Sequence, residues 1–588
     1  YALLTQTGYR EIFYNTAQSL FVLTQDLGDW VTKGLTVSIK GSFDAKNENN
    51  LSRTKTSPQW LATGRNEAGE LEFNQTQIGE ENLSYKQTNK GYRSVYFEAV
   101  ANWARTFGKH DLSAMFLFQH SQKNCVGESA NNSEKALPYR HQGIAGRITY
   151  NYDNRYFVEG NFGYNGSENF SPNHRFGFFP SIAVGYVVSN EKFFAPIRDV
   201  VSMVKLKASY GLVGNDQIGG DRRFIYNETV IGGGKYYFGT TPSQYTSVRL
   251  GEFPNPNVGW EKAKKLNLGA DLSFFNQLNI SVDYFKENRE GIFLQRKSIP
   301  MYVGLSTKPW VNIGKMRNSG IDASLEYHQP LGKDLHLTVR GNFTYARNRI
   351  MDQDEPDYAY TYMNHSGQMQ WQKFGLVAAG LFQDQEDIDS WAKQSFGEVK
   401  PGDIKYLDLN GDGIVDNYDT KPIGYSDIPE IVYGFGFSLQ WKAFDLSAFF
   451  QGVAHVSFST LTDQTQAFVG RNLKESSVFA DLYGNTWTPE NPGVKYPRMT
   501  TGAIDNNNQL STFWMANGRY LRLKNLELGY TLPKRIANKI AMQSLRVYLS
   551  GVNLFTFSPF KLWDPDLQTG ATNYPNNRII NLGLTIGF

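Results

Sequence analysis

Long segments of the chain alternate between apolar and polar residues with a period of two, the pattern of a β-strand with two different faces. In residues 266–274 every second position is apolar, and the intervening positions carry small or polar residues such as Asn267 and Asp271. The same alternation closes the chain in residues 580–588. Because a helical period of 3.6 residues is not the dominant signal, the pattern predicts an all-β protein.

The alternation predicts seventeen strands, and many of them are long. Several run to ten residues or more, whereas the strands of soluble β-sandwiches usually have about five or six. The predicted strands are residues 17–25, 35–46, 92–106, 112–122, 142–152, 156–166, 175–188, 201–213, 264–274, 278–290, 319–328, 335–348, 431–441, 446–456, 518–531, 544–555 and 578–588.

A soluble β-sandwich also alternates apolar and polar residues, but the chemistry of the two faces favours a transmembrane β-barrel. The polar face is rich in small uncharged residues, and the apolar face carries no charge in the clearest segments. A Lys or Arg at the bilayer midplane costs about 2–4 kcal/mol, which explains that absence. Aromatic residues such as Phe274, Phe275 and Trp441 crowd the strand ends, where a barrel has its aromatic girdles. We therefore expect a transmembrane antiparallel up-and-down β-barrel.

The connections between the predicted strands alternate between short and long through most of the chain. The short connections include residues 153–155, 275–277, 329–334 and 442–445, and the long ones cover about 47–91, 214–263, 349–430 and 457–517. Outer-membrane barrels have short periplasmic turns and long extracellular loops. We therefore expect barrel throughout residues 1–588, with 349–430 and 457–517 as long extracellular loops.

The number of predicted strands is odd. Alternating short and long connections place the start of the first strand outside the cell and the C-terminus in the periplasm. A closed single-chain barrel usually has an even number of strands, and an open sheet edge in lipid would leave backbone groups without partners. We therefore expect an odd number of further strands upstream, so that this sequence is the C-terminal part of a larger barrel.

Composition and the absence of known motifs exclude several classes of function. The 588 residues carry a net charge of +3, which gives no reason to expect a nucleic-acid partner. The single cysteine, Cys125, excludes an internal disulfide and a Cys-based zinc site. We find neither an H-E-x-x-H motif nor a phosphate-binding G-x-x-x-x-G-K-[ST] loop. We therefore expect no enzyme, no catalytic residues and no organic cofactor.

Several stretches resemble a known family of transporters. They are YDNRYFVEGNFGYNGSENF (152–170), RFGFFPSIAVGYVVSNEKFF (175–194), LKASYGLVGND (206–216), NPNVGWEKAKKLNLGADLSFF (255–275), NIGKMRNSGIDASLEY (312–327), GDIKYLDLNGDGIVDNYD (402–419), YLRLKNLELGYTLPKRI (520–536) and SGVNLFTFSPFKLWDPD (550–566), with Phe588 at the end. In this order they resemble the SusC/RagA-type TonB-dependent transporters of Bacteroidota outer membranes.

The resemblance implies a 22-stranded barrel with an N-terminal plug and a TonB box, neither of which is found in this sequence. It also implies TonB-dependent active import of an oligosaccharide or an oligopeptide across the outer membrane of a Gram-negative bacterium. A SusD-like surface lipoprotein would then form a lid over the barrel. The alternatives are a ligand-capturing or adhesin-type barrel without energised transport, an outer-membrane hydrolase and a soluble carbohydrate-binding β-protein.

One local motif has the spacing of an EF-hand calcium loop. Oxygen-bearing side chains occupy positions 1, 3, 5, 9 and 12 of residues 408–419, Gly413 is at position 6, and the carbonyl group at position 7 would also bind calcium. The predicted ligands of this structural calcium site are Asp408, Asn410, Asp412, Ile414 (carbonyl), Asp416 and Asp419. The alternative is an Asp/Asn/Gly turn that needs no metal.

Tryptophan residues in the predicted loops are the candidate substrate contacts. Tryptophan rings can stack on sugar rings and anchor contacts, although each ring could equally pack loops together or contact a partner protein. The candidates are Trp371, Trp391, Trp487 and Trp514. Charged residues on the polar strand faces are expected to point into the lumen as paired charges rather than as substrate sites; they are Asp271, Asp283, Asp322, Glu326, Arg340 and Arg546.

Overall fold

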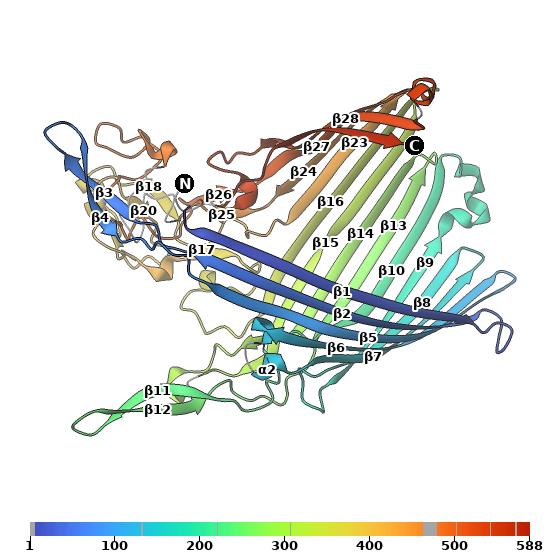
Figure 1. The fold of residues 1–588 in the computed structure, drawn as a ribbon, viewed down its shortest axis with the longest axis horizontal. Coiled ribbons are helices and arrows are strands. Elements are labelled where there is room, and N and C mark those ends of the chain that lie inside the picture. Colours follow the sequence, from blue (N-terminus) through green and yellow to red (C-terminus); the bar gives the residue numbers. More distant parts are fainter. Residues whose placement is uncertain are drawn as a thin grey trace.

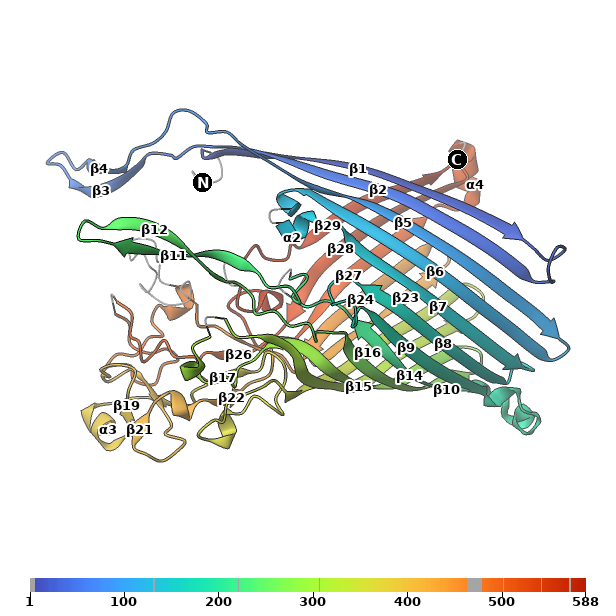
Figure 2. The same cartoon turned by 90° about the horizontal axis from the view of Figure 1, so that it is seen from below.

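Seventeen antiparallel strands form one curved sheet in the computed structural model (Figures 1 and 2). The structure describes residues 6–130, 133–219, 222–305, 307–462, 479–500, 502–540, 542–570 and 573–588. The strands of the large sheet are β1 (Gly8–Asp26), β2 (Leu35–Thr54), β5 (Lys86–Phe107), β6 (His110–Gly127), β7 (Tyr139–Tyr152), β8 (Tyr156–Ser167), β9 (Phe176–Val187), β10 (Val201–Asn215), β13 (Glu261–Phe274), β14 (Leu278–Gln295), β15 (Trp310–Pro330), β16 (Leu335–Asp352), β23 (Ile431–Trp441), β24 (Phe444–Ala454), β27 (Tyr520–Thr531), β28 (Ser544–Phe557) and β29 (Ile579–Gly587).

The topology is up-and-down, because each strand of this sheet pairs with the sheet strand that follows it in the sequence. Every pairing in the large sheet is antiparallel. Among the described strands, β1 and β29 lie at the two edges and each pairs on one side only. The predicted all-β, antiparallel, up-and-down barrel architecture is therefore confirmed, and the curved wall is open between these two edges.

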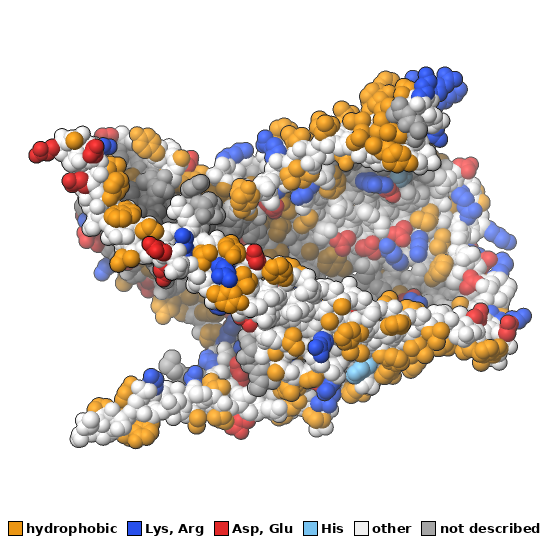
Figure 3. Space-filling view, viewed as in Figure 1, with side chains coloured by type: hydrophobic (Ala, Val, Ile, Leu, Met, Phe, Trp, Pro, Cys, Tyr) orange, Lys and Arg blue, Asp and Glu red, His pale blue; other side chains and the backbone are white. Residues whose placement is uncertain are grey.

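The pairing register gives each face of the sheet its own chemical character. Asp271 of β13 lies opposite Ser281 of β14, while the next pair along, Leu272 and Ile280, faces the other way. Alternate residues such as Leu268 and Leu549 are about half exposed on the convex face. Figure 3 shows acidic and basic side chains in the hollow of the molecule and apolar side chains along its outer surface. A wall of this kind suits lipid outside and water inside.

Aromatic side chains gather where the strands meet the short turns. Tyr156 stacks on Tyr186 of β9 with ring centroids 5.1 Å apart. On the far side of the sheet, Phe444 lies 6.2 Å from Trp441 and 4.7 Å from Tyr530. These rings form the girdle that the aromatic residues at the strand ends predicted.

Several strands continue beyond the predicted bounds on the side of the long connections. Strand β2 extends to Thr54 and β5 begins at Lys86, so residues 47–54 and 86–91 are strand and the predicted loop 47–91 is too long. Likewise β13 begins at Glu261, inside the predicted loop 214–263. These extensions are polar on both faces because they stand above the lipid, and the period-two signal is lost there.

The long connections carry small elements of their own, all at the end of the sheet opposite the short turns (Figure 2). Two hairpins project from the wall, β3 (Gln59–Arg65) with β4 (Leu71–Gln77) and β11 (Val230–Phe238) with β12 (Ser243–Leu250). The shorter strands are β17 (Lys373–Gly375), β18 (Ala378–Leu381), β19 (Lys393–Gln394), β20 (Ile404–Tyr406), β21 (Ile414–Val415), β22 (Lys421–Ile423), β25 (Ser457–Ser459) and β26 (Met515–Asn517).

The helices described are short, and the α-helices are α2 (Ser133–Ala136), α3 (Gln385–Ser390) and α4 (Lys534–Ala537). No helix in the described part of the chain has the length and apolar character needed to cross a membrane.

Two neighbouring positions of β10 test the assignment of the two faces. Ala208 lies between Val184 and Leu268 on the convex face, whereas Ser209 lies between Ala183 and Asn267 on the concave face. We expect Ala208→Lys to lower the free energy of unfolding in lipid by about 2–4 kcal/mol, because the charge enters the bilayer. Ser209→Lys is the matched control and should change it by much less, as measured by urea unfolding in vesicles. Equal destabilisation by both variants would contradict the assignment.

Candidate functional site

The concave wall carries charged side chains that form ion pairs across neighbouring strands. Lys207 of β10 lies 2.9 Å from Asp271 of β13 and 3.1 Å from Asp283 of β14. Near the short turns, Arg340 lies 2.8 Å from Glu326. All of the residues predicted to face the lumen lie on this concave face, including Asp322, which accepts a hydrogen bond from Thr344 Oγ1 at 2.8 Å.

A second cluster of this kind lies near the other edge of the sheet. Arg546 of β28 contacts both Asp445 of β24 and Glu527 of β27 at 2.5 Å. The charges therefore form compact mixed-sign groups spread over the wall, and they do not converge on one point. The Lys207 and Arg546 clusters each hold one basic and two acidic groups, so the wall offers a solute a polar surface of mixed sign. It does not resemble the paired acid and base of a catalytic site.

Above the wall, the two longest connections fold together into one compact unit, which we call the cap. It comprises the described parts of residues 353–430 and 455–519. Its apolar core is formed by Leu376, Leu381, Ile404, Tyr406, Val415, Leu482, Trp487, Tyr496 and Trp514. Ile404 and Tyr406 are fully buried at the two ends of the short strand β20, within a long connection. Burial of this extent makes the cap a defined structure rather than a set of separate loops.

Two consecutive asparagine residues hold the two connections together. Asn507 Oδ1 accepts a hydrogen bond from Ile404 N at 2.8 Å, and Asn506 Nδ2 donates one to Ile404 O at 2.7 Å. Tyr406 Oη donates to Asn506 O at 2.9 Å. Backbone groups that would be unpaired in the core of the cap are thus satisfied by side chains from about one hundred residues away.

A buried carboxylate completes this junction. Asp403 has no exposed surface, and it accepts hydrogen bonds from Asn507 Nδ2 at 2.9 Å and from Lys400 N at 2.8 Å. Arg498 of the second connection forms an ion pair with the same carboxylate at 2.8 Å. Asp403 therefore joins both connections through one charged group.

The cap is attached to the barrel wall by further ion pairs. Glu430, which is 4% exposed, contacts Arg347 of β16 at 2.5 Å and His455 at 3.1 Å. On the other side, Arg522 of β27 pairs with Asp564 and Asp566 in the connection before β29. Gln568 of that connection donates to Asp427 O at 2.6 Å, so the cap is held at two points of the rim.

Residues 408–419, the predicted calcium loop, lie at the surface of the cap and fold around their own carboxylates. Asp408 Oδ1 accepts from Gly411 N at 2.7 Å, and its Oδ2 accepts from Gly413 N at 2.8 Å. Gly413 has φ of +85°, a backbone conformation that favours glycine at this position. At the end of the loop, Asp419 is fully buried and accepts from Leu409 N at 2.6 Å and Asp416 N at 2.8 Å.

The carbonyls on either side of Ile414, the predicted backbone ligand, are directed to the neighbouring segment. Gly413 O accepts a hydrogen bond from Lys393 N and Val415 O accepts one from Ser395 N, at 3.0 Å each. Because successive carbonyls of a strand point to opposite sides, the carbonyl of Ile414 points away from β19. The loop thus combines this carbonyl with four carboxylates that form no ion pair within the described part of the chain.

The negative charge of the same loop affects the pKa of the nearby Tyr362. Its hydroxyl donates to Tyr418 O at 2.7 Å, and Tyr360 beside it lies against Tyr418. Burial raises the pKa of Tyr362, and the carboxylates of Asp419, Asp408 and Asp412 raise it further. A divalent cation bound among these carboxylates would relieve their repulsion, so the donor set fits calcium.

The carboxylates of this loop accept hydrogen bonds from backbone N–H groups in the structure. Among the described residues, no three His, Cys, Asp or Glu side chains lie together in a cluster ready to hold a metal ion.

The predicted substrate-contacting tryptophans have different surroundings. Trp487 and Trp514 are 8% and 6% exposed in the core of the cap, and Trp514 Nε1 donates to Asn507 O at 2.8 Å. Stacking of either ring on a substrate therefore does not fit this structure, because protein atoms already cover both rings. Trp391 is half-buried and donates to Tyr406 O, whereas Trp371 is 61% exposed and remains free for contact.

Sequence reasoning missed the aromatic surface of the β11–β12 hairpin. Tyr236, Tyr237, Phe238 and Tyr245 are all more than half exposed there. The signal was present as two short alternating segments around Gly239 and Pro242, but the whole stretch was taken as loop. Together with Trp60 and Phe73 of the β3–β4 hairpin, these rings give the outer end of the molecule an apolar surface suited to contact with a ligand or another protein.

Comparison with known proteins identifies the architecture. The family model for the TonB dependent receptor-like β-barrel matches residues 4–554. The chain belongs to this family. Proteins of the family are outer-membrane transporters of Gram-negative bacteria and are not enzymes, so the convex face of this TonB-dependent barrel contacts outer-membrane lipid.

Related proteins support the assignment. TonB-dependent receptor P3 of Formosa agariphila is 28% identical to this TonB-dependent barrel over 593 residues, which cover 94% of this chain and 56% of that protein. TonB-dependent receptor SusC of Bacteroides thetaiotaomicron is 27% identical over 470 residues, covering 75% and 43%. The RagAB peptide transporter superposes with a TM-score of 0.73 at 20% identity, covering 98% of this chain and 62% of that chain, which shows a shared fold. The chain thus spans about half the length of the curated relatives it matches.

Asp403 provides a test of the cap. We expect Asp403→Ala to destabilise the cap by about 3–5 kcal/mol, because it leaves the Arg498 guanidinium partly buried without its carboxylate. Limited proteolysis of the detergent-solubilised protein should then cut within residues 353–430 or 455–519, while the barrel strands stay protected. Asp505→Ala removes an exposed carboxylate close by and is the control, which should leave the cleavage pattern unchanged. An unchanged pattern for Asp403→Ala would contradict its role at the junction.

Proposed function

We propose that this barrel is the wall and extracellular cap of a TonB-dependent importer for an oligosaccharide or an oligopeptide. The observation that carries the proposal is the combination of a polar wall, whose charges are grouped in small mixed-sign clusters, with a folded cap above it. A wall whose charges are distributed in this way suits a large polar solute that must pass along it without being trapped at one point. Membership of the TonB-dependent family supports energised transport rather than passive ligand capture.

The remaining parts of the importer are part of the same proposal. Further strands would pair with the free edges of β1 and β29, since backbone groups in lipid need hydrogen-bond partners. A plug would fill the lumen and connect it to TonB, in a region outside this sequence. The exposed aromatic residues of the β3–β4 and β11–β12 hairpins support a SusD-like lipoprotein lid on the extracellular side, as does the likeness to the RagAB peptide transporter.

Trp371 is the tryptophan that we retain as a substrate contact. It is exposed in the cap and has a φ of +65°, a conformation that bulky residues rarely adopt. A residue held in such a conformation by its surroundings is a candidate for a functional role. Trp391, which is half-buried beneath Lys405, is a second but less accessible candidate.

Growth and co-purification test the importer. We expect deletion of the encoding gene to abolish growth on one class of oligosaccharide or oligopeptide, because uptake is then lost. Complementation with the natural gene should restore growth, and Trp371→Ala should restore it with about tenfold weaker apparent affinity, the loss expected for a contact residue. Trp30→Ala, which removes an exposed ring from the turn between β1 and β2 at the other end of the sheet, is the control.

The strain complemented with the natural gene tests whether the protein has a lipoprotein partner. The protein purified from this strain in mild detergent should carry a surface lipoprotein that mass spectrometry can identify. If the deletion strain grows normally on every substrate but its surface no longer binds a ligand that the complemented strain binds, the protein is a ligand-capturing barrel instead. Cleavage of the ligand by the purified protein would support a hydrolase.

We also propose that residues 408–419 bind a structural calcium ion. The side chains of Asp408, Asn410, Asp412, Asp416 and Asp419 would supply oxygen atoms, together with the carbonyl of Ile414. Position 12 is Asp rather than Glu, and its shorter side chain reaches less far toward the ion. The ion would tie the surface loop to Tyr362 and so stiffen the outer part of the cap.

Elemental analysis tests the calcium proposal. After dialysis against buffer with millimolar calcium and then gel filtration, we expect one calcium per chain in the natural protein and none in Asp412→Ala with Asp416→Ala. Glu386→Ala with Asp389→Ala removes two exposed carboxylates from α3 and is the matched control, which should retain the ion. A natural protein that holds no calcium after this treatment would show that the loop is a metal-free turn.

A further inference from the structure

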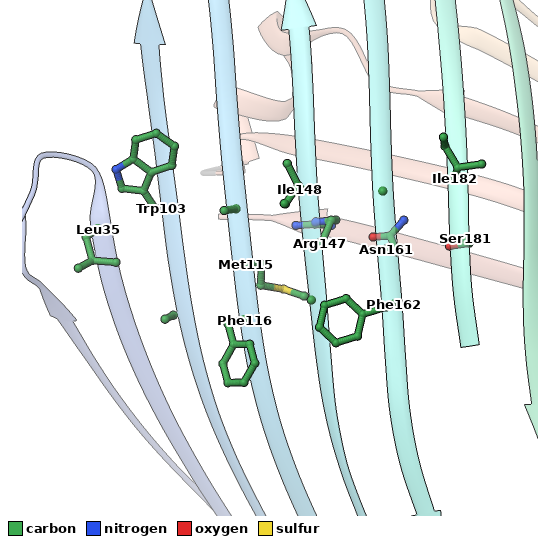
Figure 4. A pocket seen from close by; sticks show the side chains of 14 residues that line it. Leu35, Trp103, Met115, Phe116, Arg147, Ile148, Asn161, Phe162, Ser181 and Ile182 are labelled. Atoms are coloured by element: carbon green, nitrogen blue, oxygen red, sulfur yellow. The ribbon is translucent and has the colours of Figure 1, made fainter. Parts of the chain in front are cut away.

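The convex face of the barrel has an apolar groove near its periplasmic end. It crosses strands β5 to β9 and has a volume of about 620 Å³, within the range of about 300–1,000 Å³ of small-molecule sites. Figure 4 shows Trp103, Phe116, Ile148, Phe162 and Ile182 along it, on successive strands. Its lining is mostly apolar, with Arg147, Asn161 and Ser181 as the polar residues that border it. The groove lies outside the barrel, so it is not part of the proposed substrate path.

The groove arises from an alternation of large and small residues across neighbouring strands. On the convex face Ala114 pairs with Trp103 on one side and with Ile148 on the other. Ile148 in turn pairs with Gly160, and Gly160 pairs with Ile182. Each small residue thus leaves a depression between two large side chains, and the depressions lie in one row across the sheet.

One of the neighbouring depressions is filled by the protein, but the one at Gly160 is not. A Cβ atom on Gly146 would meet the ring of Phe162 at 2.3 Å, because that ring leans over the glycine. A Cβ atom on Gly160 would meet nothing within 4 Å. The open floor of the groove is therefore at Gly160, and in the membrane only lipid or another apolar molecule can fill it.

Basic residues lie at the periplasmic end of the groove. Arg105 follows Trp103 by two residues on the same face of β5, is exposed, and lies 4.8 Å from the ring of Phe107. Lys33 is in the adjoining turn, whose Gly34 O accepts a hydrogen bond from Ala104 N at 3.0 Å. Neither basic side chain forms an ion pair within the described part of the chain. An anionic group at this level would therefore find cations without partners.

We propose that the groove binds one acyl chain of an anionic diacyl phospholipid from the periplasmic leaflet, with the lipid phosphate beside Arg105 and Lys33. The apolar floor takes the chain, and Trp103 and Phe107 lie at the level of the lipid glycerol. The basic pair gives the site its preference for an anionic headgroup, since each basic residue near the membrane surface attracts anionic lipid. A bound lipid would stay with the barrel when neighbouring lipids exchange.

Native mass spectrometry of the full detergent-purified chain tests this proposal. The probes are phosphatidylglycerol and phosphatidylcholine with identical palmitoyl and oleoyl chains, added at equal concentration. We expect the natural protein to retain one phosphatidylglycerol in preference to phosphatidylcholine. Gly160→Leu fills the open floor without a backbone clash and should lower retention of phosphatidylglycerol about tenfold, because the chain loses apolar contact.

Two matched variants make the result specific. Gly41→Leu adds the same side chain to another open position on the convex face, on β2, and should leave lipid retention unchanged. Arg105→Gln with Lys33→Gln should remove the preference for phosphatidylglycerol, whereas Lys333→Gln, in the turn between β15 and β16, should not. Equal retention by Gly160→Leu and the natural protein, or no preference between the two lipids, would overturn the proposal. A dimer that Gly160→Leu dissociates would also overturn it and would assign the groove to a second copy of the chain.

Discussion

Hydrogen bonding of the backbone in lipid is the constraint on which the rest of this molecule depends. No water is present in the bilayer core to satisfy an unpaired N–H or C=O group, so strands that cross it must pair along their full length. The continuous antiparallel pairing from β1 to β29 follows from this requirement. The pairing register then determines whether each side chain faces lipid or the lumen. A shift of the register by one residue would exchange the two faces.

The same constraint confines irregular structure to the extracellular end. There the chain leaves the sheet for long stretches, and its backbone polar groups are satisfied by other means. In the cap, Asn506 and Asn507 serve the backbone around Ile404 in the way that a neighbouring strand does in the wall. Asp403 adds a buried charge that only Arg498 and the adjacent donors make tolerable. The cap is thus a small water-facing domain with its own core, built on the rim of a membrane protein.

The sequence predicted the wall well because lipid imposes a strict chemical alternation. Each of the seventeen predicted segments corresponds to one strand of the sheet, and the larger errors lie at the strand ends opposite the short turns. There β1 begins at Gly8 rather than near residue 17, and β15 begins at Trp310 rather than near residue 319. Above the membrane both faces of a strand meet water, so the residues no longer alternate although the hydrogen bonding continues.

The cap was predicted less well, for a physical reason. Whether Trp514 faces a ligand or the protein depends on contacts such as that of Asn507 with Asp403, which are about one hundred residues apart in the chain. A pattern read along the sequence does not contain such pairings. The loop of residues 408–419 differs because its contacts are local. The Gly at position 6 of its motif indicated a sharp turn, and the structure shows such a turn with a positive φ at Gly413.

The pairing of charges on the concave wall has a consequence for selectivity. A cluster such as Lys207 with Asp271 and Asp283 keeps one net negative charge, because one ammonium group faces two carboxylates, and salt screens the field of that charge over about 8–10 Å. In the importer that we propose, a solute further than this from the wall would experience little attraction or repulsion. Discrimination between solutes would then fall to the entrance, where shape and aromatic contact can select what enters.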